Sequence, residues 1–202
     1  MFVKVCGLRS VDDVRAAGAA GADAVGFVLH PASPRYVDPE LARELVTHVP
    51  EQVLSVVVVA EHAADDAARI TREIGADVLQ LHGGYTAEDF ARVADRGVRS
   101  WRATSLADDP APRVGRFGEE ALLLDSPRAG SGETWDVEAL DPPPAGHWLL
   151  AGGLDPDNVA GAIRRIRPWG VDVSSGVERT RGVKDHTRIA EFVAAARSVH
   201  TR

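Results

Sequence analysis

The stretch Ala20-Gly21-Ala22-Asp23-Ala24-Val25 recurs later in the chain as Ile74-Gly75-Ala76-Asp77-Val78-Leu79. In both copies a glycine ends a helix-like segment, and an apolar run begins within three residues. Glycine suits the left-handed position that follows a helix, so each copy predicts a helix that passes into a strand. A fainter copy, Trp169-Gly170-Val171-Asp172, stands near the end of the chain. The chain is therefore expected to repeat a unit of one strand and one helix.

Short β-branched runs alternate with alanine-rich, charged segments along the rest of the chain. This alternation is typical of βα units around a parallel sheet. We expect strands at residues 3–6, 24–29, 54–60, 78–82, 99–103, 121–125, 147–151 and 170–174. Helices are expected at residues 11–20, 39–48, 63–74, 87–96, 109–117, 135–140, 156–167 and 185–200.

The number of units decides between an open and a closed sheet. Eight strands in 202 residues match the lower edge of the size range of a (β/α)8 barrel, or TIM barrel, and so favour closure over an open doubly wound sheet. The fifth and sixth helices are weak, because residues 109–117 contain two prolines and residues 135–140 make only about a turn and a half. We predict an α/β fold, a single (β/α)8 domain over residues 1–202, with short or irregular fifth and sixth helices.

Composition excludes several classes of function. With one cysteine, a net charge of −7 and no basic stripe, the chain is expected to form no internal disulfide and to bind no nucleic acid. It has no apolar run of the roughly 20 residues that a membrane helix needs, and its start does not resemble a signal peptide. The seven histidines form no zinc-like cluster. We expect a cytoplasmic protein without a metal or a membrane partner, either a monomer or a homodimer.

Polar residues stand where the predicted strands end. Cys6, His82, Asp125 and Ser174 end four of the strands, and Arg35 follows the second strand. In (β/α)8 barrels the active site lies at the carboxyl ends of the strands. We therefore expect these side chains to meet at one mouth of the barrel.

A second polar layer is expected below this mouth, because alternate side chains of a strand share a face. It comprises Lys4, Gln80, Arg102 and Asp172. The first and eighth strands are neighbours in a closed barrel. The pattern therefore predicts an ion pair between Lys4 and Asp172, which relieves the cost of burying either charge.

Two loops have the residues of a phosphate site. Ala151-Gly152-Gly153-Leu154 follows the seventh strand, and Ser174-Ser175-Gly176-Val177 follows the end of the eighth. Barrels commonly bind phosphate through these loops, where glycines let backbone N–H groups approach the anion and serine hydroxyls add donors. We expect the phosphate of a small substrate to be held by Gly152, Gly153, Ser174, Ser175 and Gly176.

Each candidate also has a plainer interpretation. A lone cysteine such as Cys6 is usually an inert member of the core. Asp125 suits a general acid but also a cap for the turn that follows it. Arg35 can bind a planar carboxylate of a substrate or form a salt bridge within its loop. His82 can orient a substrate or form a hydrogen bond that is only structural.

Taken in order, the motifs resemble those of phosphoribosylanthranilate isomerases, which are (β/α)8 barrels. The resemblance runs nearly from end to end of the chain, and the order and spacing of its pieces make it specific. It rests on Lys4-Val5-Cys6-Gly7-Leu8, Gly21-Ala22-Asp23-Ala24-Val25-Gly26-Phe27, Ser33-Pro34-Arg35-Tyr36, Val78-Leu79-Gln80-Leu81-His82-Gly83, Leu124-Asp125, Gly130-Ser131-Gly132, Gly152-Gly153-Leu154 with Asn158-Val159, and Val171-Asp172-Val173-Ser174-Ser175-Gly176-Val177-Glu178.

The resemblance implies an Amadori rearrangement in tryptophan biosynthesis, in which N-(5-phosphoribosyl)anthranilate becomes 1-(2-carboxyphenylamino)-1-deoxyribulose 5-phosphate without a cofactor. Asp125 would protonate the ribose ring oxygen and help to open the ring to a Schiff base. Cys6 would then remove the proton from C2. Arg35 would bind the anthranilate carboxylate, and His82 and Asp172 would contact the substrate.

The role implied for Cys6 makes a demand on its surroundings. A thiol is mostly protonated at neutral pH, so a base at this position needs a cation or a helix dipole nearby. Lys4, in the layer below, is the candidate.

The sequence departs from the family pattern in two places. Gly130-Ser131-Gly132-Glu133 stands where the loop after strand six often reads Gly-x-Gly-Lys, and Arg181-Gly182 stands where Pro-Gly is common. Glu133 reverses a charge close to Asp125, so we expect altered loop closure or KM rather than lost chemistry. Arg128 is the candidate for the missing cation.

Two alternatives stay open. Bifunctional isomerases of histidine and tryptophan synthesis resemble this chain in their phosphate loops, but use an aspartate where Cys6 stands. A non-catalytic barrel that binds phosphorylated metabolites belongs to another class, because a fold alone does not define a function. The joint presence of Cys6, Asp125 and Arg35 favours the isomerase.

Overall fold

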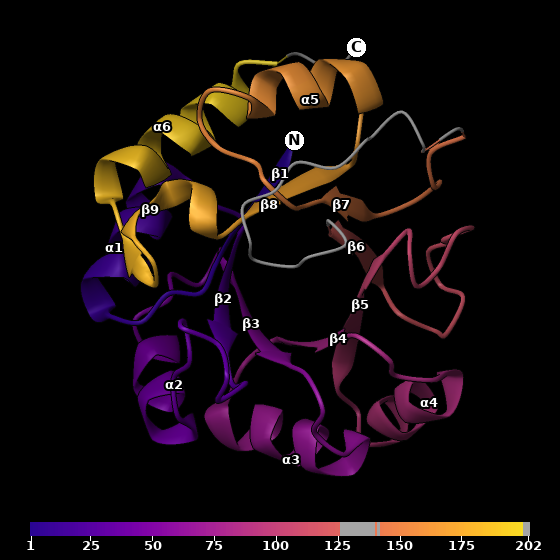
Figure 1. The fold of residues 1–202 in the computed structure, drawn as a ribbon. Helices are drawn as coiled ribbons and strands as arrows, with labels where there is room; N and C mark the ends of the chain where they lie inside the picture. Colours follow the sequence, from indigo (N-terminus) through magenta and orange to yellow (C-terminus); the bar gives the residue numbers. More distant parts are fainter. Residues whose placement is uncertain (126–139, 141, 200–202) are drawn as a thin grey trace.

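The structure, a computed structural model, describes residues 1–125, 140 and 142–199. Eight parallel strands form a closed barrel, in which each strand pairs with the next in sequence and β8 pairs with β1 (Figure 1). The strands are β1 (Phe2–Cys6), β2 (Ala24–Val28), β3 (Leu54–Val59), β4 (Val78–His82), β5 (Arg99–Ser105), β6 (Ala121–Asp125), β7 (Trp148–Leu150) and β8 (Gly170–Val173). The predicted barrel is confirmed in strand order and in closure.

Helices surround the strands, and they are α1 (Val11–Ala20), α2 (Pro39–Val46), α3 (Ala64–Ile74), α4 (Ala87–Asp95), α5 (Val159–Ile166) and α6 (His186–Arg197) (Figure 1). Gly21 and Gly75 follow α1 and α3 with φ of 88° and 80°, the left-handed conformation that the repeated pattern predicts. Asp23 then accepts a hydrogen bond of 2.8 Å from Val3 N–H of the neighbouring strand. The aspartate of the second copy makes the same bond to β3. Each copy therefore ties a helix end to an adjacent strand.

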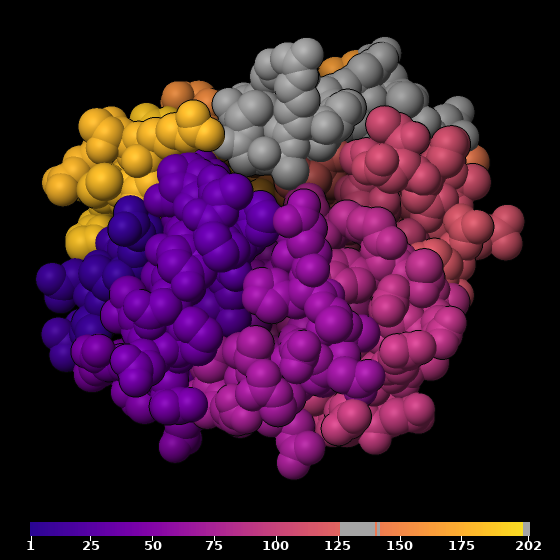
Figure 2. All heavy atoms as spheres, turned by 60° about the horizontal axis from the view of Figure 1, so that its bottom comes forward, coloured from indigo at the N-terminus to yellow at the C-terminus, as the bar shows by residue number. Residues whose placement is uncertain are grey.

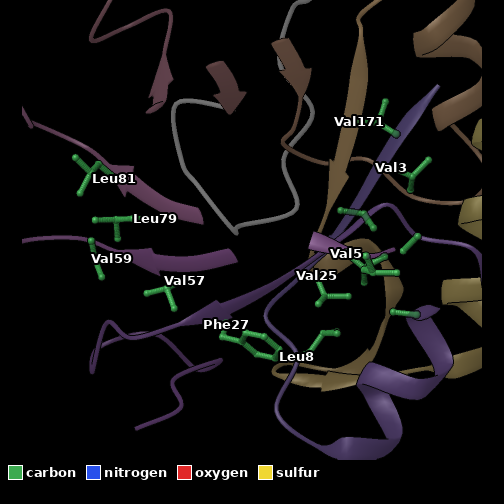
Figure 3. Close-up of a cluster of buried hydrophobic side chains, with 14 of the residues drawn as sticks. Val3, Val5, Leu8, Val25, Phe27, Val57, Val59, Leu79, Leu81 and Val171 are labelled. Atoms are coloured by element: carbon green, nitrogen blue, oxygen red, sulfur yellow. The ribbon is translucent and has the colours of Figure 1, made fainter. Parts of the chain in front are cut away.

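Alternation along the strands separates two buried layers. The outer layer packs against the helices and includes Val3, Val5, Val25 and Val171, which Figure 3 shows together on neighbouring strands. The inner layer contains no helix residue and lies inside the barrel. Its members are Cys6, Ala24, Val56, Val58, Val78, Trp101, Ala103, Ala121, Leu123, Leu149 and Ala151.

The connection from β5 to β6 differs from the prediction. Residues 106–120 form turns and no helix, so the expected fifth helix at residues 109–117 is wrong. Its two prolines lack the N–H donors that a helix needs. The expected sixth helix, at residues 135–140, lies outside the described residues except for Leu140, as does the loop with Arg128 and Glu133.

Buried ion pairs hold this helix-free connection instead. Arg102 Nη1 lies 2.8 Å from Asp109 Oδ2, and its Nε lies 2.9 Å from Glu119 Oε1. Trp101 and Ala103, the neighbours of Arg102 on β5, belong to the inner layer, so Arg102 faces the outside of the barrel. Its predicted place in the polar layer below the mouth is therefore wrong.

A short hairpin that the sequence did not predict follows β8. After a single turn of 3-10 helix, η2 (Ser175–Val177), the strands β9 (Glu178–Thr180) and β10 (Val183–Lys184) pair in antiparallel fashion.

α6 then packs beside α1, so that the last part of the chain meets the first, as Figure 2 shows at the surface. In the part of the chain that the structure describes, no helix has the length and apolar character to cross a membrane.

Candidate active site

The carboxyl ends of the strands enclose a cavity of about 310 Å³. Five of the residues expected at the mouth line it: Cys6, Arg35, His82, Asp125 and Ser174. Asp172 and Gln80 of the lower polar layer also reach it. The cavity extends over the loop after β2, where its wall includes residues 32–35.

The predicted ion pair between Lys4 and Asp172 is confirmed below the cavity. Lys4 Nζ lies 2.8 Å from Asp172 Oδ1, and the two residues face each other in the register of β1 and β8. Burial alone would lower the pKa of Lys4. The Asp172 carboxylate and the Cys6 sulfur outweigh it and hold this pKa above its ordinary value, so Lys4 is charged.

The thiol of Cys6 is buried at the end of β1. Burial raises its pKa, the ammonium groups of Lys4 and Lys184 oppose that rise, and Asp172 adds to it. Lys4 thus favours the thiolate as expected, but burial has the larger effect. The thiol is therefore protonated at neutral pH, and its thiolate is a stronger base than that of an ordinary cysteine.

Gly7, directly after Cys6, permits the close packing of the mouth. Its φ is 77°, and a Cβ there would lie 2.6 Å from Cδ of Arg35 and 3.1 Å from Oγ of Ser174. A larger residue would displace both side chains. The glycine therefore allows Arg35, in the loop after β2, and Ser174, directly after β8, to pack against the backbone beside Cys6.

Arg35 lines the cavity but is also held from behind. Its Nε and Nη2 donate to the two carboxylate oxygens of Glu178 at 2.6 and 3.1 Å. Lys184 Nζ lies 3.0 Å from Glu178 and donates to the carbonyl oxygen of Ser174 at 2.8 Å. Burial favours the protonated form of Glu178, but Arg35, Lys184 and the N–H of Gly182 outweigh it and lower the pKa of this carboxyl.

His82 and Gln80 extend the wall along β4. Burial, together with the charge of Lys4, lowers the pKa of His82, so the ring is neutral at neutral pH. Gln80 is 2% exposed, and its Oε1 has no hydrogen-bond partner among the described residues. A buried acceptor without a donor costs about 1–3 kcal/mol, which marks this position as one that packing alone does not explain.

A small pocket of about 30 Å³ adjoins the cavity between the loops after β7 and β8. Gly152, Gly153, Ser174 and Ser175 line it, with Asp125 and Asp172 shared between the two spaces. Among the described residues, nothing accepts a hydrogen bond from the backbone N–H of Gly152 or Gly153. These donors suit an anion such as phosphate.

Gly176 does not line this pocket. A Cβ at this position would collide with the carbonyl oxygen of Leu154. The role of Gly176 is therefore to let the two loops approach each other, and the extra helix that often completes such a site is here only the single turn η2.

Sequence reasoning missed the cluster behind Arg35. Lys184 and Glu178 had visible signals, since Lys184 is one of two lysines in the chain and Glu178 ends a motif quoted above. Arg181, noted only as a departure from the family pattern, also lines the cavity. Within the described ranges, no group of three or more His, Cys, Asp or Glu side chains is arranged to hold a metal ion.

The closed barrel, with a polar cavity at the carboxyl ends of its strands, has the architecture of a (β/α)8-barrel enzyme. A family model described as N-(5'phosphoribosyl)anthranilate (PRA) isomerase matches residues 3–195. The chain belongs to this family.

Individual relatives agree with this assignment. The N-(5'-phosphoribosyl)anthranilate isomerase of Dechloromonas aromatica is 43% identical over 96% of this chain and 95% of its own length. The crystal structure of TrpF from Jonesia denitrificans is similar with a TM-score of 0.91 and 53% identity, over 98% of this chain and 97% of that one. A phosphoribosyl anthranilate isomerase in complex with reduced 1-(o-carboxyphenylamino)-1-deoxyribulose 5-phosphate is similar with a TM-score of 0.83 and 31% identity, over 98% of this chain and 100% of that one.

Proposed function

We propose that the protein isomerises N-(5'-phosphoribosyl)anthranilate to 1-(2-carboxyphenylamino)-1-deoxyribulose 5-phosphate, with Asp125 as the acid and Cys6 as the base. One observation carries the assignment of roles: the thiol and the carboxyl group line the same cavity, and that cavity adjoins a pocket with two available backbone donors. The reaction needs an acid and a base around a small sugar whose phosphate is fixed.

The phosphate would bind between Gly152, Gly153, Ser174 and Ser175. The sugar would then lie between Asp125 and Cys6, and the aromatic ring would reach the loop after β2. Protonation of the ring oxygen by Asp125 opens the ring to a Schiff base. Cys6 removes the proton from C2, and the enolamine tautomerises to the ketone.

The neutral ring of His82 can accept or donate one hydrogen bond to a sugar hydroxyl without adding charge. Asp172, whose charge is balanced by Lys4, can accept a second one. Arg35 would bind the anthranilate carboxylate through donors that Glu178 leaves available. Its pairing with Glu178 fixes the plane of the guanidinium and therefore the direction from which the anthranilate carboxylate can bind.

The test is loss of anthranilate fluorescence on rearrangement. Cys6→Ala and Asp125→Asn should each lower kcat by about 10²–10⁴-fold while binding of inorganic phosphate is kept. Asp95→Asn, an exposed change at the end of α4 on the outside of the barrel, is the matched control and should keep full activity. A wild-type protein without activity that still binds phosphate would favour a non-catalytic barrel.

A parallel assay with the aldose substrate of the histidine-pathway isomerase separates the bifunctional alternative. We expect no turnover of that substrate. We also propose a cytoplasmic location, because the base is a free thiol and a reducing compartment keeps it so.

A further inference from the structure

The hairpin after β8 places one more cation at the cavity. Arg181 is the first residue of the turn that joins β9 and β10, and its exposed side chain lines the cavity together with Arg35. On its wall the cavity also has the carboxylates of Asp125 and Asp172. A substrate with an anionic group at each end needs a cation at the end far from the phosphate pocket.

Arg35 alone offers a reduced set of donors there. Two of its donor nitrogens are bound to Glu178, so the charge of the guanidinium is already balanced by a carboxylate. Asp172 is balanced in the same way by Lys4. Arg181 differs, because it forms no ion pair with any residue of ranges 1–125, 140 and 142–199. Its five N–H donors stay available to a ligand.

The turn that presents Arg181 is fixed to the loop that contains Arg35. Glu178 accepts a hydrogen bond of 2.9 Å from Gly182 N–H, which closes the turn. Arg9 Nη1 donates to the carbonyl oxygens of Pro34 and Gly182 at 3.3 and 3.4 Å. Gly182 packs against Pro34 so closely that a Cβ there would lie 2.6 Å from the Pro34 carbonyl oxygen. The loop with Arg35 and the turn with Arg181 are therefore fixed relative to each other.

We infer that Arg181 is a second binding residue for the anthranilate carboxylate and determines specificity for this anionic group. Arg35 offers N–H donors in a fixed position, but its charge is balanced by Glu178. Arg181 supplies the net positive charge that attracts the carboxylate. This inference rests on the proposed function, because it assumes a substrate with its phosphate between the loops after β7 and β8.

The test compares Arg181→Gln with Arg179→Gln. Arg179 lies on the same hairpin and is also exposed, but does not line the cavity, so it controls for the loss of one positive charge. We expect Arg181→Gln to raise KM by about five- to tenfold, with kcat changed by less than about twofold because uniform binding is lost. Arg179→Gln should leave KM within about twofold of wild type.

A substrate without the carboxylate gives the decisive comparison. For N-(5-phosphoribosyl)aniline, wild type and Arg181→Gln should have equal kcat/KM. Equal losses for both substrates, or equal effects of the two substitutions, would overturn the inference. Wild-type turnover of the natural substrate tests the proposed function separately. If turnover is absent, binding of reduced 1-(o-carboxyphenylamino)-1-deoxyribulose 5-phosphate to the two variants still tests Arg181, and equal affinities would count against it.

Discussion

Lys4 Nζ lies 2.8 Å from Asp172 Oδ1 across the junction of β1 and β8, and the Lys4 side chain is wholly buried. This ion pair joins the first strand of the barrel to the last. It also sets the local field below Cys6, since the ammonium and the carboxylate act on the pKa of the thiol in opposite directions.

Removal of one partner of this pair should be severe. Lys4→Met leaves the Asp172 carboxylate buried without its counter-charge, which costs about 3–5 kcal/mol of unfolding free energy. Urea unfolding followed by circular dichroism measures it. The double substitution Lys4→Met/Asp172→Asn should recover most of the loss, because no charge is then left buried.

The control for this experiment is Arg69→Met. Arg69 pairs with Glu73 at 2.9 Å on the exposed face of α3, so the same type of change should leave the unfolding midpoint unaltered. A Lys4→Met variant as stable as Arg69→Met would show that the buried pair contributes nothing.

The titration of Cys6 can be followed without interference, because the chain has no other cysteine. Burial raises the pKa of this thiol, so the thiolate forms at higher pH than the ordinary value of about 8.5. The rate of alkylation by iodoacetamide should therefore rise with pH to a midpoint above that of glutathione. kcat/KM should rise over the same pH range. Cys6→Ser should show no alkylation, and a midpoint at or below the ordinary value would contradict the prediction.

Glu178 should contribute stability that depends on pH. Its pKa is lowered in the folded state, so the contribution is complete above the unfolded value of about 4.3 and is lost as the pH falls through the lower, folded value. Glu178→Gln should cost about 3 kcal/mol at pH 7, and the gap to wild type should narrow below about pH 4.

The matched change for Glu178 is Glu120→Gln. Glu120 also pairs with an arginine, Arg99, but at the exposed start of the strands. Its loss should leave the unfolding curve nearly unchanged at every pH. If the two variants lose equal stability at pH 7, the cluster behind Arg35 is not stabilising.

Gln80→Met should separate stability from activity. It removes the buried Oε1 that lacks a partner and should raise stability by about 1 kcal/mol, while kcat/KM falls because the amide lines the cavity. Ser55→Ala is the control, since Ser55 is equally buried but its hydroxyl bonds to Asp77 at 2.7 Å. This control should lose stability. If Gln80→Met lost as much stability as Ser55→Ala, the prediction would be refuted.

The fold follows from short-range signals in the sequence. The Gly-Ala-Asp pattern ends a helix, starts a strand and also supplies the aspartate that binds the adjacent strand, so one local motif encodes both an element boundary and a neighbour. The partnership of Lys4 with Asp172 was predictable because closure makes β1 and β8 neighbours. The meeting of the loops after β7 and β8 at one pocket was predictable because they follow adjacent strands of the barrel.

Other features depend on information that a single strand does not contain. Alternation shows that successive side chains face opposite sides of a strand, but it does not show which set faces inward. On β5, Trp101 fills space inside the barrel, so Arg102 faces outward. The pair of Arg35 with Glu178 joins residues 143 positions apart, one in the loop after β2 and one in the short hairpin after β8. Neither segment has a periodic pattern, so residues of the cavity could be listed from the sequence but their pairing could not.

Lys184 links the two ends of the site. Its ammonium binds the Ser174 carbonyl oxygen beside the small pocket between the loops after β7 and β8, and it also binds the Glu178 carboxylate that holds Arg35. With phosphate in that pocket, as proposed, Lys184 would connect the phosphate end of the ligand to the group that orients Arg35, and the binding of the two ligand ends would be coupled. Because such coupling is reciprocal, inorganic phosphate and free anthranilate should each tighten the binding of the other by the same factor.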